Sequence, residues 1–191
     1  MVKQGAKLED RRKNAVVKLL PVFRQYGYEG ATLSRLSDAT GLGRASLYHH
    51  FPNGKEEMAA GVLDYAREVV GETIIAPLKA PGEPLIRLCT MSQRVSEFYH
   101  QGQSACLLAV LSLGEADGLF HDAVKRSLEG WLNALTQVLI EAGIEPNTAR
   151  ERSENAVMQI QGALVLVRGL EDTSLFDRVM AQLPDQLLAK N

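Results

Sequence analysis

Apolar residues recur at helical spacing along almost the whole chain, and this pattern constrains the fold more than any other feature. Val16, Leu19 and Phe23 lie near its beginning, and Leu183 and Leu187 lie near its end. Residues three or four apart share one face of an α-helix, whereas a half-buried strand needs strict alternation. No two alternating segments are joined by a hairpin turn. The sequence therefore predicts an all-α fold.

Turn residues divide the pattern into segments of helical length. Pro21 lies inside the first segment, where a proline removes a backbone donor and costs a helix interior roughly 3 kcal/mol. We therefore expect a kink or a helix boundary there. The long helix that starts near Lys55 should end before Pro77. The expected helices span about 8–26, 32–40, 43–51, 55–76, 84–101, 104–114, 118–142, 147–168 and 172–189.

Composition is typical of a folded protein of the cytoplasm. Hydrophobic residues make up 46% of the 191 residues, which is enough for a sizeable core. Cys89 and Cys106 are the only cysteines, too few for a disulfide framework. No window approaches ~20 uninterrupted apolar residues, and the first residues, MVKQGAKLEDRRKN, lack the apolar segment of a secretory signal. We expect a cytoplasmic protein with no membrane partner.

The net charge of −2 conceals a strong asymmetry. Residues 1–55 hold 10 Lys and Arg against 4 Asp and Glu, a net charge of +6. The remaining residues hold 11 basic against 19 acidic side chains, a net charge of −8. A basic N-terminal segment on an acidic remainder favours binding of a polyanion by that segment alone. The alternative is that these basic residues only solvate an exposed helix face.

Two short helices joined by a glycine turn are expected after the first helix. Thr32 is suited to cap the first of them, because its hydroxyl can accept from a free backbone N–H. Gly41 can adopt the positive φ of a tight turn. Leu47 and Phe51, at i and i+4, share the inward face of the second short helix. This arrangement predicts a helix-turn-helix.

Two histidines stand side by side in that second helix, in the run SLYHHF. Adjacent residues point about 100° apart on a helix, so the pair cannot hold one metal ion. A catalytic base needs a substrate pocket, which a short helix in a basic segment does not offer. We therefore expect no metal, no cofactor and no catalytic residue. The exposed side chains can instead reach DNA base edges and phosphates, although Tyr48 and His50 could also pack between helices; they are Arg44, Ala45, Ser46, Tyr48, His49 and His50.

Residues 32–58, TLSRLSDATGLGRASLYHHFPNGKEEM, resemble the DNA-binding segment of the tetracycline-repressor (TetR) family of bacterial transcriptional regulators. The resemblance covers about residues 8–65 and rests on Gly41, Leu47, Tyr48, His50 and Phe51. It implies phosphate contacts from Thr32 and Lys55, and base or phosphate contacts from Arg44, Ala45, Ser46, Tyr48 and His50.

Two positions depart from the family pattern, and the first is Pro21, which is unusual in the first helix. Gly54 adds a residue before Lys55, so we expect this lysine to be displaced from the usual phosphate position. The motif FPNGKEEM, together with the later run Cys106-Leu-Leu, resembles the sequences of a branch of the family that controls multidrug and aromatic-compound export.

The resemblance also implies a division of the chain into a helix-turn-helix domain (1–54), a connecting helix (55–76) and an effector-binding and dimerisation domain (77–191). One helix reads only a few base pairs, so we expect a homodimer with recognition helices about 34–36 Å apart. The last two helices are the candidates for the interface, unless they only complete the protomer core. The candidate interface residues are Val157, Ile160, Gly162, Ala163, Leu164, Val167, Leu175, Val179 and Leu183.

A ligand site is implied in the C-terminal domain. Apolar side chains there could line a pocket between helices, although each one alone is more often ordinary core. Arg94, Glu97 and His100 are candidates for polar groups that orient a ligand. The resemblance implies that a ligand shifts the connecting helix and thereby weakens DNA binding. The candidate pocket residues are Phe98, Tyr99, Cys106, Leu107, Leu111, Trp131, Leu135 and Met158.

The leading hypothesis is a homodimeric repressor that a small, mainly apolar ligand releases from a near-palindromic operator. An alternative is a DNA-binding regulator that responds to redox state through Cys106, or to a protein partner. A small helical enzyme is the contrasting hypothesis. It would need a nucleophile and base pair, a phosphate-binding glycine loop or a metal site, and the sequence has none of these patterns.

Overall fold

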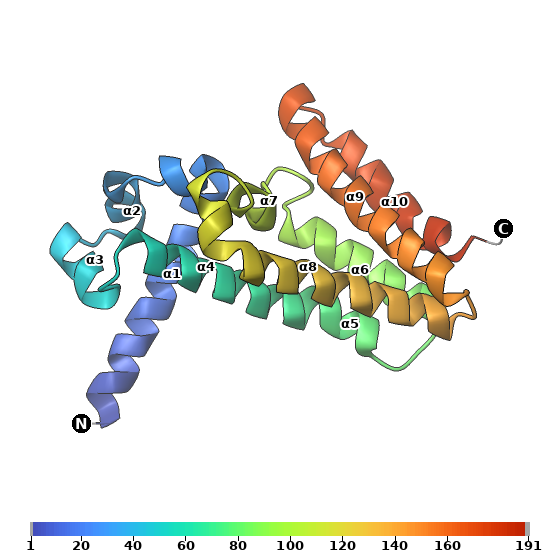
Figure 1. Cartoon of the computed structure of the whole chain (residues 1–191), viewed down its shortest axis with the longest axis horizontal. Coiled ribbons are helices and arrows are strands. Elements are labelled where there is room, and N and C mark those ends of the chain that lie inside the picture. The colour runs from blue at the N-terminus through green and yellow to red at the C-terminus, as the bar shows by residue number, and fades with distance from the viewer. Residues whose placement is uncertain (1, 190–191) are drawn as a thin grey trace. The chain divides into compact units, whose positions relative to one another are not determined.

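The computed structural model describes residues 2–189, with side chains described from Glu9 onward, and every element in that range is helical (Figure 1). The expected all-α fold is confirmed. None of the described helices is long and apolar enough to cross a membrane. In chain order the elements are α1 (Val2–Gly30), α2 (Leu33–Thr40), α3 (Arg44–His50), α4 (Lys55–Val70), the π-helix η1 (Gly71–Ile75), α5 (Ala76–Lys79), α6 (Pro84–Phe98), α7 (Leu107–Leu111), α8 (Glu115–Glu141), α9 (Pro146–Leu170) and α10 (Ser174–Leu188).

The helices form two compact units. The first unit comprises residues 1–68 and 107–124, and the second comprises residues 69–106 and 125–191. The sequence suggested boundaries at residues 54 and 76, followed by one continuous C-terminal domain. In the structure, residues 107–124 cluster with the N-terminal helices instead.

The core of the first unit is built from the apolar stripe of α1 and the inward residues of the short helices. Leu19 and Phe23 of α1 and Leu36 of α2 are fully buried, as are Leu47 of α3 and Phe51 just after it. Burial of an apolar side chain of this size contributes roughly 1.5–3 kcal/mol. The two residues predicted to hold the second short helix against the core therefore do so.

Residues 107–124 complete the first unit by packing on α1. The rings of Tyr28 and Phe120 meet edge to face, with centroids 5.7 Å apart. The carboxylate of Glu29 accepts a hydrogen bond of 2.7 Å from the backbone N–H of Glu115, the first residue of α8. A carboxylate is favoured there, because the first N–H groups of a helix have no partner within it.

α1 passes through Pro21 and loses helical geometry at Gly27 instead. The helix boundary expected as one alternative at Pro21 was therefore wrong. Pro21 is exposed, so water can bond the carbonyl that its missing N–H leaves without a helical partner. Gly27 has φ 68° and ψ −174°, a conformation that only glycine adopts readily.

The segment expected as one helix from residue 55 to residue 76 is divided. α4 ends at Val70, η1 forms one turn of π-helix, and α5 extends the helical path to Lys79. Pro77 lies in the first turn of α5, where a missing N–H costs little, so this proline does not end the path.

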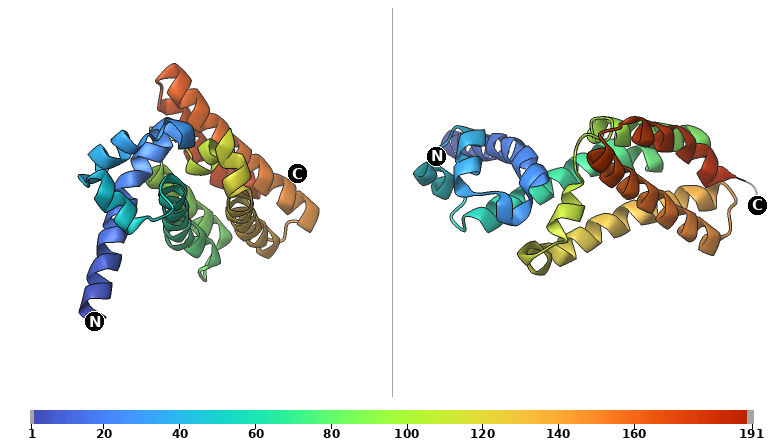
Figure 2. Two further views of the ribbon diagram at one scale, coloured as in Figure 1. Left: turned by 60° about the vertical axis from the view of Figure 1, so that its left-hand side comes forward. Right: turned by 90° about the horizontal axis from the view of Figure 1, so that it is seen from above.

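In the second unit α9 and α10 pack side by side (Figure 2), and α6 lies against both α10 and α5. Polar bonds connect these helices. The buried Arg87 of α6 donates from Nε to the carbonyl oxygen of Leu78 at 2.8 Å and pairs with Glu141 of α8 at 2.5 Å. The hydroxyl of Ser92 donates to the carbonyl of Met180 in α10.

Candidate nucleic-acid interface

The turn between α2 and α3 is fixed by hydrogen bonds of its own residues. Thr32 caps α2, as its hydroxyl accepts from the N–H of Arg35 at 3.4 Å. Gly41 ends α2 with φ 71°, which confirms the positive φ expected there. The hydroxyl of Ser37 then donates to the carbonyl of Leu42 at 2.6 Å. These bonds set the direction in which α3 leaves α2.

α3 has one buried and one exposed face. Leu47 is fully buried, and His50 is half-buried. The ring of Tyr48 is 49% exposed, so it is available to a partner and does not pack in the core. The side chains predicted to read DNA therefore lie largely on the solvent side of one short helix; those exposed are Arg44, Ala45, Ser46, Tyr48 and His49.

Lys55, the first residue of α4, contacts an aromatic ring of the same unit. Its ammonium lies 4.3 Å from the centroid of Tyr28, within the range of a cation–π interaction. Burial and the carboxylates of Glu56, Glu115 and Glu29 raise the pKa of Tyr28, in that order of size, so this phenol is neutral under Lys55 near neutral pH.

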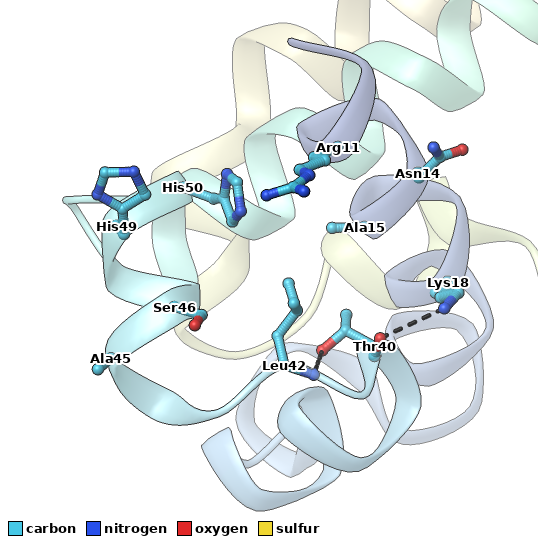
Figure 3. Close-up of a pocket in the computed structure, with 10 residues that line it drawn as sticks. All are labelled: Arg11, Asn14, Ala15, Lys18, Thr40, Leu42, Ala45, Ser46, His49 and His50. Carbon is cyan, nitrogen blue, oxygen red and sulfur yellow. Dashed lines mark hydrogen bonds between the residues drawn. The ribbon is translucent and has the colours of Figure 1, made fainter. Parts of the chain in front are cut away.

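A groove of about 540 Å³ runs between α1 and α3 (Figure 3). Side chains of α1 form one wall and those of α3 the other. None of its ten lining residues is acidic, and we call it the α1–α3 groove. It is lined by Arg11, Asn14, Ala15 and Lys18 of α1, Thr40 and Leu42 at the end of α2, and Ala45, Ser46, His49 and His50 of α3.

The electrostatics of this groove favour an anion. Burial, and then the nearby His49, Arg11 and Arg12, lower the pKa of His50 below its ordinary value of 6.5. The like charges among these causes disfavour a further positive charge, and an anion in the groove would offset them. The Nδ1 atom of His50 is buried and has no hydrogen-bond partner among the described residues.

Three groove residues from α1 were missed by the sequence-based interpretation of the DNA-binding surface; they are Arg11, Asn14 and Lys18. The signal was present, because Arg11 and Lys18 are basic and lie off the apolar stripe of α1. The same is true of Arg12 and Lys13, which pair with Glu57 at 2.8 Å and Glu68 at 3.8 Å in α4. The sequence alone could not tell which basic residues line the groove and which pair with α4, because that depends on how the helices pack.

Metal chemistry finds no support in the paired histidines. The rings of His49 and His50 lie 5.5 Å apart, edge to face. Within the part of the chain that the structure describes, no three His, Cys, Asp or Glu side chains come together as a metal site requires.

The candidate pocket residues do not all belong to one unit. Leu107 and Leu111 are buried in the first unit. Met158 is 61% exposed on α9, and Phe98 is half-buried. In the second unit, the hydroxyl of Tyr99 donates to the thiol sulfur of the buried Cys106 at 3.4 Å. The candidates that are buried in the second unit are Tyr99, Cys106, Trp131 and Leu135.

Most candidate interface residues lie inside the protomer. Leu175 and Val179 are half-buried, and Gly162 is exposed. The buried ones are Val157, Ile160, Ala163, Leu164, Val167 and Leu183. A second apolar line on α9 faces solvent. Met158, Gly162, Leu166 and Leu170 follow one another along it at spacings of four residues, and Val165 and Gly169 belong to the same exposed face.

Family models match both parts of the chain. The model described as "Bacterial regulatory proteins, tetR family" matches residues 20–62. The model described as "Transcriptional regulator LmrA/YxaF-like, C-terminal domain" matches residues 87–182. The first match covers α2 and α3 with parts of α1 and α4, and the second runs from α6 into α10.

Curated relatives and solved structures agree with these matches. The transcriptional regulator LmrA of Bacillus subtilis is 22% identical, over 93% of this chain and 97% of its own. The transcriptional repressor AcnR of Corynebacterium glutamicum is 39% identical, over 37% of this chain and 39% of its own. A TetR transcriptional regulator from Chloroflexus aurantiacus has the same fold, with a TM-score of 0.80, 19% identity, and coverage of 97% of this chain and 98% of its own.

Proposed function

Because the chain belongs to the TetR family of bacterial transcriptional regulators, we propose that it is a homodimeric repressor that a small, mainly apolar ligand releases from a near-palindromic operator. Regulators of this family bind operator DNA and are not enzymes. The observation that carries the proposal is the exposed face of α3, a helix that the buried Leu47 anchors in the core and that borders a groove without acidic side chains. Such a function operates in the cytoplasm, where the DNA is.

The exposed apolar line of α9 supports dimerisation. Apolar side chains as exposed as Val165, at 70%, and Leu170, at 65%, contribute little to the stability of a monomer. Gly162 and Gly169 have no atoms beside them where a Cβ would stand, so a second helix could approach this face closely. We therefore propose this line, together with the half-buried Leu175 and Val179 of α10, as the surface between two copies.

Two buried donors in the second unit support a ligand that carries a hydrogen-bond acceptor. The indole N–H of Trp131 and the amide Nε2 of Gln161 are buried, and neither has a partner among the described residues. Trp131 is only 4% exposed. A buried donor without an acceptor costs about 1–3 kcal/mol, which a bound acceptor would recover. An uncharged molecule with one or two oxygen acceptors suits these two buried donors better than a cation does.

The operator test starts with a selection from random-sequence duplex DNA in moderate salt. We expect a short near-palindrome to emerge, with half-sites one helical turn apart. The double variant Tyr48→Ala/His50→Ala should lose the preference while keeping its helical circular dichroism. Weak binding without any enriched sequence, for wild type as well, would reject the proposal.

A further inference from the structure

The α1–α3 groove carries basic and polar side chains on both of its walls. Its α1 wall carries two cations, Arg11 and Lys18, and its α3 wall includes Ser46 and His49 from the exposed face (Figure 3). We propose that this groove binds a phosphate of the DNA backbone, and that Arg11 of α1 is the principal cation of this binding site. The inference rests on the proposed function, and it makes α1 a DNA-contacting element.

Continuity with the recognition face argues for a phosphate of the DNA itself. A helix in the major groove is flanked by the phosphates of both strands, so a cavity beside that helix meets one of them. Ala45, Ser46 and His49 are exposed on α3 and also line the groove. A duplex docked on α3 therefore places backbone oxygens at the opening of this cavity.

Charge neutralisation separates Arg11 from three neighbouring cations of α1, Arg12, Lys13 and Lys18. Arg12 is paired with Glu57, and Lys13 with Glu68, both from α4. Lys18 donates to the backbone carbonyl of Thr40 at 3.3 Å and so helps to cap the end of α2. Arg11 is exposed and has no ion pair or hydrogen bond to the other described residues.

Asn14 adds a neutral donor to the same wall. It stands three residues after Arg11 and four before Lys18, so the three side chains lie along one edge of α1. Phosphate-binding sites commonly combine charged donors with amide or hydroxyl donors. Ser46 on the facing wall supplies the hydroxyl. The groove thus offers a phosphate donors from two helices.

The test compares Arg11→Gln with Lys13→Gln, which removes the same charge from an exposed position two residues away on the same helix. Operator affinity is measured by fluorescence anisotropy between about 50 and 200 mM salt. Each neutralised phosphate contributes a slope of about −0.9 in log K against log salt. Arg11→Gln should flatten the slope by about that amount and weaken operator and random DNA by similar factors, and Arg11→Lys should restore the slope.

Equal slopes for wild type, Arg11→Gln and Lys13→Gln on a confirmed operator would overturn the inference and leave the proposed function intact. Absence of any enriched operator would instead remove the proposed function itself. A free anion is the other possible occupant, so the protein without DNA is titrated with inorganic phosphate. Saturable stabilisation by phosphate that Arg11→Gln abolishes, with an unchanged DNA salt slope, would assign the groove to a small anion and also overturn the inference.

Discussion

The ring of Tyr48 in α3 lies against Gly54, the last residue before α4. A Cβ built on Gly54 would stand 3.2 Å from Cε1 and 3.8 Å from the hydroxyl oxygen of Tyr48. Gly54 also has φ 66°, in the region that favours glycine. The residue that this chain adds before Lys55 therefore lies beside the exposed tyrosine ring, where any side chain would touch that ring.

Gly54→Ala should weaken operator binding as well as the fold, whereas a matched glycine elsewhere should weaken the fold alone. Positive φ costs an alanine about 1–2 kcal/mol, and the new methyl group also pushes on the tyrosine ring. We expect operator affinity to fall about tenfold, the loss of roughly one specific contact. Gly143→Ala is the control, because Gly143 has φ 86° and nothing within 4 Å of its added Cβ. Chemical unfolding should show that Gly54→Ala and Gly143→Ala destabilise the fold by similar amounts. Gly143→Ala should nevertheless bind the operator as the wild type does.

Local features of the first unit could be predicted because each depends on a few neighbouring residues. The cap at Thr32, the turn at Gly41 and the burial of Leu47 follow from side-chain chemistry and helical spacing. The contact of Glu29 with Glu115 spans 86 positions, so no local pattern contains it. This separation is why the association of residues 107–124 with the N-terminal helices was not foreseen.

Long-range packing also decides which face of an apolar helix is buried. α9 carries two apolar lines, one with Ile160 and Leu164 and one with Leu166 and Leu170. Periodicity detects both and cannot rank them, because both consist of residues that favour burial. The packing of the second unit buries the first line and leaves the second exposed.

Operator binding should strengthen as the pH falls below 6.5. The pKa of free His50 lies below that ordinary value, because burial and then His49, Arg11 and Arg12 disfavour its charged form. Glu57, which pairs with Arg12, offsets part of that charge. A bound phosphate favours the charged form, so the complex takes up a proton that the free protein lacks.

The measurement is the operator dissociation constant at constant salt from about pH 7.5 down to about pH 5.5, spanning the ordinary histidine pKa. Wild type should tighten over this window, and His50→Gln should tighten less. His49→Gln removes the neighbouring imidazole and serves as the comparison. Identical pH profiles for wild type and His50→Gln would exclude His50 as the group that takes up the proton.

Glu29→Gln should lower the thermal stability of the protein at neutral pH. Hydrogen bonds from its own backbone and from the N–H of Glu115 lower the pKa of Glu29 below 4.5, its ordinary value. A carboxylate with a depressed pKa stabilises the fold above that value, and the contribution disappears as the pH falls through the folded pKa. The difference in melting temperature should therefore be full at pH 7 and vanish in acid. Glu151→Gln, at an exposed position of α9, should show no such difference at any pH.

Val165→Glu should convert the protein to a monomer. The change places a charge in the centre of the apolar line on α9, where a partner would have to desolvate it. Ile86→Glu adds the same charge at another exposed apolar position, on α6 of the same unit. Sedimentation velocity should find a monomer for the first variant and a dimer for the second. A dimer in both cases would show that the two copies meet through a different surface.

Trp131 should report binding of an acceptor-bearing ligand directly, because it is the only tryptophan in the chain. The probes are 9-fluorenone and fluorene, which share a planar shape but differ in the carbonyl oxygen. We expect fluorenone to quench Trp131 emission at about fivefold lower concentration, the effect of one neutral hydrogen bond of about 1 kcal/mol. Gln161→Leu should reduce this preference, whereas Gln159→Leu, exposed on the same helix, should keep it. Equal binding of both probes, or equal effects of both variants, would mean that these buried donors do not select the ligand.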